Sequence, residues 1–245
     1  MIEGETATVV LVHGAGGGPW IWEAVGKELD ALGVEHLEVD LPTMDESCDP
    51  SANFHTDAAH VRAVIDDIEA PAVLCGNSYG GVVITEASAG HPRVERLVYL
   101  AAAMPDAGEK VMADLVSSCT PEFIAGLVFG ADGRGGIDPE VVKKVAFQQA
   151  LPEVADWAAA HLRPMAMGSG GSPTLEGAGW HSIQSTYVVC SEDRSIRPEV
   201  QRRWARSRAS ETIEVPFDHC PPLSHPKEVA EILARSAKAD PSSVS

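Results

Sequence analysis

The stretch Ala72-Val73-Leu74-Cys75-Gly76-Asn77-Ser78-Tyr79-Gly80-Gly81 decides the fold. Residues 72–75 form a short apolar run typical of a buried strand, and residues 80–89 are expected to form a helix. Between them, residues 76–80 fit the pattern Gly-x-Ser-x-Gly, whose small residues permit a tight turn from strand to helix. Such a turn exposes the Ser78 hydroxyl beside the free N–H groups of the helix N-terminus. Ser78 is therefore the predicted nucleophile, and the alternative is a plain glycine-rich turn.

Strand-length apolar runs alternate with helical patterns on both sides of this turn. Further strands are expected at residues 6–12, 34–41, 97–101, 186–190 and 212–215. Further helices are expected at residues 19–32, 54–68, 198–207 and 227–238. Six strands that alternate with helices predict an α/β fold with a mostly parallel six-stranded sheet flanked by helices.

Residues 104–180 interrupt the alternation. They contain no convincing buried strand, only helical stretches at 109–117, 139–149 and 152–162 that are separated by glycine and proline. An insertion that leaves one strand end and returns to the next is expected to cover the sheet. The sequence therefore predicts a helical cap at 104–180, inserted before the penultimate strand, and a core made of residues 1–103 and 181–245. The alternative is a structural excursion or a mobile loop.

Composition excludes several classes of protein. The chain has 18 Lys and Arg against 36 Asp and Glu, so its net charge of -18 disfavours nucleic acid and anionic membrane surfaces as partners. No apolar stretch reaches the roughly 18 residues that span a bilayer, and the first residues lack the basic start of a signal peptide. The five cysteines are scattered, which indicates neither a disulfide framework nor a metal site. These features predict a soluble, cytoplasmic, reduced protein.

A nucleophilic serine needs a base, and that base needs an orienting carboxylate. On this kind of sheet the expected chain order is serine, acid, histidine, each on a loop after a strand. His219 follows the last predicted strand and is the favoured base, whereas His225 begins the final helix and is the alternative. The remaining histidines precede the serine, follow it too closely or fall in the predicted cap: His13, His36, His55, His60, His91, His161 and His181.

The predicted acid is Asp193, because it lies just beyond the strand at 186–190. Three other carboxylates stand near strand ends. Glu192 is its neighbour, Asp218 adjoins the histidine it would have to orient, and Asp40 precedes the serine.

A glycine-rich loop, His13-Gly14-Ala15-Gly16-Gly17-Gly18, follows the first strand. One N–H from this loop and the N–H of Tyr79 would make a two-donor oxyanion hole. The alternative is a phosphate-binding loop, but the stretch has neither the Walker lysine nor the spacing of a dinucleotide fingerprint.

These segments together resemble the α/β-hydrolase superfamily, in the small-esterase branch that contains plant methyl-ester esterases and hydroxynitrile lyases. The resemblance covers most of the chain and is weakest in the predicted cap. Its motifs are Val10 to Ala15 with Trp20-Ile21-Trp22, Gly76 to Gly81, Ser191 to Ile196 with Gln201, and Asp218-His219. The resemblance implies Ser78 as nucleophile, Asp193 as acid and His219 as base, with the N–H groups of Ala15 and Tyr79 in the oxyanion hole.

Three positions depart from that branch. Asn77 stands where a histidine is common, which is expected to alter the pocket wall. Gly14 and Cys220 stand where the hydroxynitrile lyases carry threonine and lysine. Both replacements favour ester hydrolysis over cyanohydrin cleavage.

The sequence thus predicts a serine hydrolase that cleaves a small-molecule carboxylic ester through an acyl-enzyme, with no cofactor and no metal. The alternatives are a lactonase, a C–C hydrolase or a lyase on the same triad, or a ligand-binding receptor on a hydrolase scaffold. Large apolar side chains in the predicted cap are expected to line a substrate pocket or to form the cap's own core. They are Phe123, Phe129, Phe147, Trp157, Met165 and Met167.

Overall fold

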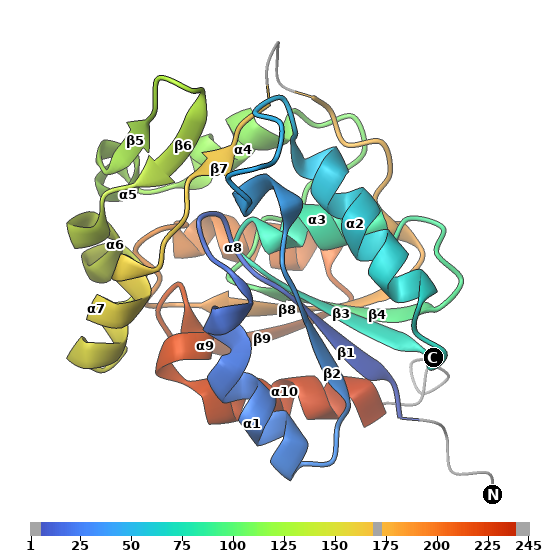
Figure 1. The fold of residues 1–245 in the computed structure, drawn as a ribbon. Helices are drawn as coiled ribbons and strands as arrows, with labels where there is room; N and C mark the ends of the chain where they lie inside the picture. The colour runs from blue at the N-terminus through green and yellow to red at the C-terminus, as the bar shows by residue number, and fades with distance from the viewer. Residues whose placement is uncertain (1–5, 169–172, 239–245) are drawn as a thin grey trace, which may run out of the picture.

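A computed structural model describes residues 6–168 and 173–238, so the ends of the predicted core and residues 169–172 of the predicted cap lie outside it. Within these residues, six strands form one sheet in the order β2-β1-β3-β4-β8-β9, and every neighbouring pair is parallel (Figure 1). The predicted six-stranded α/β architecture is confirmed. The strands are β1 (Thr8–Val12), β2 (His36–Val39), β3 (Ala72–Asn77), β4 (Val94–Leu100), β8 (Gln184–Cys190) and β9 (Glu211–Val215).

Helices cover both faces of this sheet. On one face lie α1 (Glu23–Ala31) and α10 (Pro226–Lys238), and on the other lie α2 (Phe54–Asp66), α3 (Gly80–Ala87) and α8 (Pro198–Arg208) (Figure 1). The short helix α9 (Pro221–Ser224) precedes α10. Single 3₁₀ turns are found at Pro19–Trp22, Pro42–Met44 and Gly179–His181. Among the described residues, no helix is long and apolar enough to cross a membrane.

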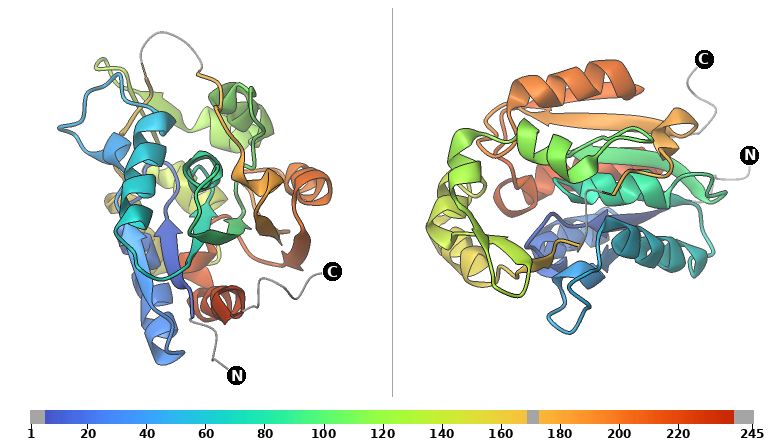
Figure 2. Two further views of the ribbon diagram at one scale, coloured as in Figure 1. Left: turned by 90° about the vertical axis from the view of Figure 1, so that its right-hand side faces the viewer. Right: turned by 90° about the horizontal axis from the view of Figure 1, so that it is seen from above.

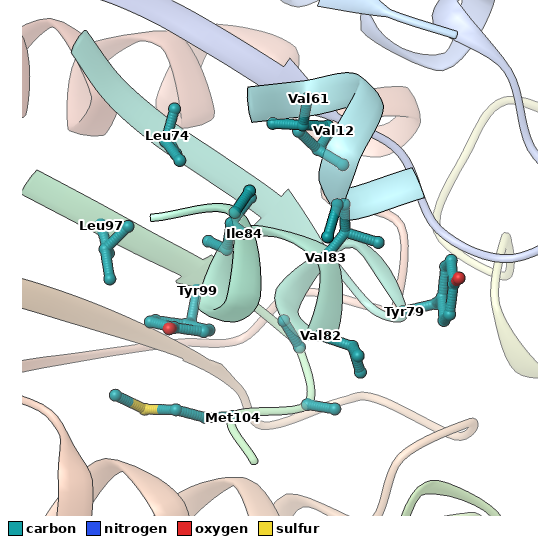
Figure 3. Packing of buried hydrophobic residues seen from close by; sticks show 14 of the residues in the cluster. Val12, Val61, Leu74, Tyr79, Val82, Val83, Ile84, Leu97, Tyr99 and Met104 are labelled. Atoms are coloured by element: carbon teal, nitrogen blue, oxygen red, sulfur yellow. The ribbon is translucent and has the colours of Figure 1, made fainter. Parts of the chain in front are cut away.

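Alternation along the buried strands divides the core into two layers. Successive side chains of a strand point to opposite faces, so Val9 and Leu11 of β1 pack with α1 and α10, while Val10 and Val12 face the other helices. Figure 3 shows this second layer, where Ile84 of α3 lies close to Leu74 and Leu97 of the sheet. Because both faces are covered, the central strands are almost continuously apolar.

The part of segment 104–180 that runs from α4 to β7 lies at the carboxyl ends of the parallel strands (Figure 2). It contains short strands as well as helices, so the expectation of helical stretches alone was wrong. Strands β5, β6 and β7 form an antiparallel sheet of their own. The elements are α4 (Val111–Ser118), α5 (Pro121–Ala125), β5 (Leu127–Phe129), β6 (Arg134–Ile137), α6 (Pro139–Val145), α7 (Pro152–Ala160) and β7 (Met165–Ala166).

Candidate active site

Ser78 occupies a sharp turn between β3 and α3. Its φ of 56° lies in the left-handed region, which L-residues other than glycine seldom adopt. The turn requires close backbone approach on either side of the serine. A Cβ added at Gly76 would lie 2.5 Å from the carbonyl of Gly80, and one at Gly80 would lie 2.5 Å from the carbonyl oxygen of Val12. Glycine at these two positions therefore allows the turn, which holds the serine at the carboxyl edge of the sheet.

The loops after β3, β8 and β9 bring Ser78, Asp193 and His219 together. Nε2 of His219 lies 2.8 Å from Oγ of Ser78, and Nδ1 of the same ring lies 2.7 Å from Oδ2 of Asp193. Since the carboxylate can only accept, Nδ1 carries the ring proton and Nε2 accepts from the serine hydroxyl. Asp193 and His219 are buried, so these hydrogen bonds are shielded from water.

The carboxylate of Asp193 is fixed by three donors besides the histidine. Oδ1 accepts the backbone N–H of Ser195 at 2.6 Å and of Ile196 at 3.0 Å, and Oδ2 accepts Nε2 of Gln201 at 2.7 Å. A buried carboxylate needs such partners because it has lost its hydration. The four donors leave the acid in one orientation.

Two buried side-chain amides, those of Gln201 and Asn77, position the acid and the histidine. Neither was predicted to have that role. Gln201 of α8 accepts the N–H of Cys190 at 3.0 Å while its other end holds Asp193. Asn77 donates to the carbonyl oxygens of Leu100 at 2.9 Å and of His219 at 3.0 Å. Asn77 lines the cavity, in agreement with the expectation that this residue affects the pocket wall. It also holds the backbone of His219. The sequence signal that could have indicated this role is the polar Asn77 at the end of an otherwise buried apolar strand.

Ala15 and Tyr79 both line the cavity beside Ser78. Within residues 6–168 and 173–238, neither of their backbone N–H groups donates to another protein group. The glycine-rich loop is held by a turn in which Gly17 N–H donates to Gly14 O at 3.2 Å. The N–H of Gly16 also contacts Sδ of Met44 at 3.3 Å.

The side chain of Tyr79 is anchored beneath the site. Its hydroxyl donates to Oδ2 of Asp57 at 2.7 Å, and Thr43 donates to the same carboxyl from its hydroxyl at 2.6 Å and its N–H at 3.0 Å. Burial raises the pKa of the Asp57 carboxyl and the pKa of the Tyr79 hydroxyl. This network fixes the residue whose backbone follows the serine.

The alternative residues lie elsewhere. The ring of His225 stacks on Phe217, with a centroid separation of 4.0 Å, and its Nδ1 lies 2.8 Å from Oγ of Ser224. Asp218 is buried, accepts the Ser224 hydroxyl at 2.7 Å, and has its pKa raised by burial. Glu192 is exposed, and Asp40 forms an ion pair with Arg163. None of these four side chains forms a hydrogen bond with Ser78.

A cavity of about 160 Å³ adjoins Ser78 and His219. Apolar side chains from segment 104–180 form much of its wall, and among the described lining residues there is no acid, lysine or arginine. Five of the six large side chains expected there line it, namely Phe123, Phe129, Phe147, Met165 and Met167. Trp157 instead packs edge-on against Trp20 at a centroid distance of 5.3 Å.

In the part of the chain that the structure describes, no cluster of three or more His, Cys, Asp or Glu side chains could hold a metal ion. The five cysteines are free thiols, four of them buried.

A parallel sheet whose carboxyl edge carries a serine at a strand-to-helix turn, with a histidine and an aspartate after later strands, defines the α/β-hydrolase class of fold. This chain belongs to the alpha/beta hydrolase family, and the family's sequence profile matches residues 9–232. The resemblance inferred from the motifs is confirmed.

Similar proteins agree with this assignment. The alpha/beta hydrolase nvfD of Aspergillus novofumigatus is 28% identical over 244 residues, which cover 94% of this chain and 96% of that protein. A carbendazim hydrolyzing esterase of Nocardioides sp. (strain SG-4G) is 27% identical, with 93% and 98% covered. Methylesterase 1 of Arabidopsis thaliana is 25% identical, with 93% and 95% covered.

Among solved structures, polyneuridine aldehyde esterase matches with a TM-score of 0.83 at 24% identity, covering 95% of this chain and 100% of that one. A pyrethroid hydrolase from Sphingobium faniae JZ-2 matches with a TM-score of 0.81 at 22% identity, covering 95% and 98%. At these identities the likeness establishes the fold.

Proposed function

We propose that this chain is a cofactor-independent serine hydrolase that cleaves small carboxylic esters through an acyl-enzyme. Ser78 is the nucleophile, His219 the general base and Asp193 the acid that orients the imidazole. The observation that carries the proposal is the continuous pair of hydrogen bonds, 2.8 Å from serine to histidine and 2.7 Å from histidine to aspartate. The esterase names of the relatives support the same reaction class.

The reaction follows from the direction of these hydrogen bonds. Oγ of Ser78 attacks the ester carbonyl carbon while its proton passes to Nε2 of His219, and Asp193 stabilises the imidazolium that forms. The N–H groups of Ala15 and Tyr79 stabilise the negative oxygen of the tetrahedral intermediate. His219 then gives its proton to the leaving alcohol. Water, deprotonated by the same nitrogen, releases the carboxylic acid and restores the serine.

The cavity wall favours esters whose acyl or alcohol group is apolar and uncharged. The Asn77 amide and the Ser195 hydroxyl, polar groups of the wall, already donate to backbone carbonyls. Ser78, His219 and the N–H groups of Ala15 and Tyr79 can then meet the ester itself. A carboxylate on the substrate would lose its hydration in this cavity and would find no lysine or arginine to pair with among the described lining residues. A cavity of about 160 Å³ is comparable to one that holds a benzene ring.

Active-site labelling tests the nucleophile directly. A fluorophosphonate probe is expected to modify the protein at one site, and mass spectrometry should find the tag on the peptide that contains Ser78. The probe needs an activated serine and an oxyanion hole, so the Ser78→Ala variant should remain unlabelled. Labelling of another residue, or equal labelling of the variant, would contradict the proposal.

Charge discrimination tests the apolar wall. p-Nitrophenyl butyrate and mono-p-nitrophenyl succinate have four-carbon acyl chains and share a leaving group, but the succinate carries a carboxylate. We expect kcat/KM to be about 100-fold higher for the butyrate, because the cavity offers no partner to the charge. Steady-state kinetics on both esters measures the ratio.

A pair of variants provides the control. Val116 is 38% exposed and lines the cavity, whereas Val128 is 51% exposed and does not line it. Val116→Arg should lower the ratio of kcat/KM for the butyrate to kcat/KM for the succinate about tenfold, because the arginine supplies a cation for the succinate carboxylate. Val128→Arg should leave the ratio within about twofold. A ratio near one in the unaltered protein would show that the wall does not select against charge.

A further inference from the structure

Arg163 lies between α7 and β7, in the segment that covers the sheet, and it contacts the glycine-rich loop at three points. Its backbone N–H donates to Gly16 O at 2.8 Å. Its side chain donates to Gly17 O twice, from Nε at 3.0 Å and from Nη2 at 2.7 Å. The loop packs directly against the guanidinium, because a Cβ added at Gly18 would lie 2.9 Å from Nη2.

The guanidinium is held on its other side by Asp40, which follows β2. Nη2 lies 2.5 Å from Oδ1 and Nη1 lies 3.2 Å from Oδ2, a bidentate pairing that fixes the plane of the group. The His13 ring and the Arg163 guanidinium both lower the pKa of the Asp40 carboxyl. The carboxylate therefore stays charged at neutral pH, and the arginine stays oriented towards the loop.

The two carbonyl groups that Arg163 holds belong to the turn that contains Ala15. Gly17 N–H closes this turn on Gly14 O, so the peptide planes on both sides of Ala15 are coupled to those of Gly16 and Gly17. A donor aimed at a developing oxyanion must be fixed before the reaction, since reorienting it costs free energy in the transition state. A residue that fixes Gly16 and Gly17 thus also fixes the direction of the Ala15 N–H.

We infer that Arg163 is a positioning residue for the oxyanion hole, through which the segment covering the sheet holds the glycine-rich loop in its reactive shape. The inference rests on the proposed function. It also means that the segment around Arg163 and the glycine-rich loop move together. Displacing that segment would then misalign the Ala15 N–H. The residue acts through the loop and does not touch the reacting atoms.

The test compares turnover with substrate binding in Arg163→Ala. Since removing a whole oxyanion donor costs about 100- to 1,000-fold in kcat, a misdirected one should cost about 10- to 100-fold. KM for p-nitrophenyl butyrate should change less than about threefold, because the apolar wall is intact. Benzeneboronic acid forms a tetrahedral adduct with the serine, and its inhibition constant should weaken by a factor similar to the loss in kcat.

Arg208→Ala is the matched control. Arg208 also donates to a backbone carbonyl, that of Met104, and pairs with both oxygens of a carboxylate, that of Glu109, but it does not contact the glycine-rich loop. A similar loss of thermal stability with an unchanged kcat in this variant would separate positioning from general stabilisation. An equal fall in kcat in both variants, or a fall in Arg163→Ala that appears in KM alone, would overturn the inference.

Arg163→Lys decides the question if Arg163→Ala does not fold. A lysine keeps the charge but cannot pair with Gly17 and Asp40 in the same fork, so kcat should fall about threefold to tenfold with KM unchanged. An unchanged kcat and boronate affinity in that variant would overturn the inference. Failure of the proposed function would look different, because the unaltered protein would then take no fluorophosphonate label at Ser78.

Discussion

Replacing Ser78 with alanine is expected to lower kcat for p-nitrophenyl acetate by about 10,000-fold or more. The variant lacks the oxygen that His219 would deprotonate, so no acyl-enzyme can form. Alanine keeps the Cβ, and the turn at positive φ is then no more strained than with serine. The free N–H groups remain and should sustain a small residual rate. Stopped assays at high protein concentration, with circular dichroism to verify folding, measure the loss.

Ser195→Ala is the control for this change, because Ser195 also lines the cavity. Its hydroxyl donates to the Val145 carbonyl at 3.0 Å, and its contact with Asp193 is made by the backbone, which alanine retains. This variant should keep kcat within about threefold while losing about 1 kcal/mol of stability. If Ser195→Ala were the inactive variant and Ser78→Ala the active one, the assignment of the nucleophile would be wrong.

Asp193→Asn is expected to lower kcat by about 10,000-fold without removing any atom from the nucleophile or the base. The N–H groups of Ser195 and Ile196 require an oxygen at the Oδ1 position, so the new NH₂ group must face His219. It can only donate to Nδ1, which forces the ring proton onto Nε2. In that tautomer Nε2 cannot accept the proton of Ser78. Kinetics of p-nitrophenyl acetate hydrolysis should therefore show loss of turnover with a folded protein.

Glu192→Gln is the control for Asp193→Asn, because it also replaces a carboxylate with an amide, at the residue directly before Asp193. Glu192 is exposed and its side chain does not contact the site, so kcat should change less than about twofold. Asp218→Asn distinguishes the alternative acid, since Asp218 is buried beside the histidine but contacts Ser224 and Gln149 instead of the ring. Retention of more than a tenth of kcat in Asp193→Asn, together with its loss in Asp218→Asn, would transfer the role to Asp218.

The strands of the main sheet could be predicted because burial on both faces leaves a strong pattern in the sequence. Runs such as residues 6–12 and 72–75 are apolar enough to indicate strands without any knowledge of their partners. Chain order then narrowed the histidines, because parallel strands present all their carboxyl ends at one edge. The structure brings Ser78, Asp193 and His219 together at that edge.

Features that depend on contacts distant in the chain could not be predicted. The strand β6 begins Arg134-Gly135-Gly136, which lacks the β-branched and aromatic residues that mark a strand. Its pairing with β5 is a local hairpin, but its pairing with β7 joins Arg134 to Ala166 and is a tertiary effect. Arg163 contacts residues 146 positions earlier, and no local pattern indicates that a surface arginine will meet a glycine carbonyl.

The two outer strands of the main sheet, β2 and β9, each pair on one side only. Both are short and carry charged or ionisable side chains, Glu38 and His36 on β2 and Glu211 and Glu214 on β9. A strand from a second copy would bring further carboxylates towards these edges, and the net charge of -18 opposes that approach. Association by sheet extension is thus disfavoured, which protects concentrated solutions of the protein against edge-to-edge aggregation.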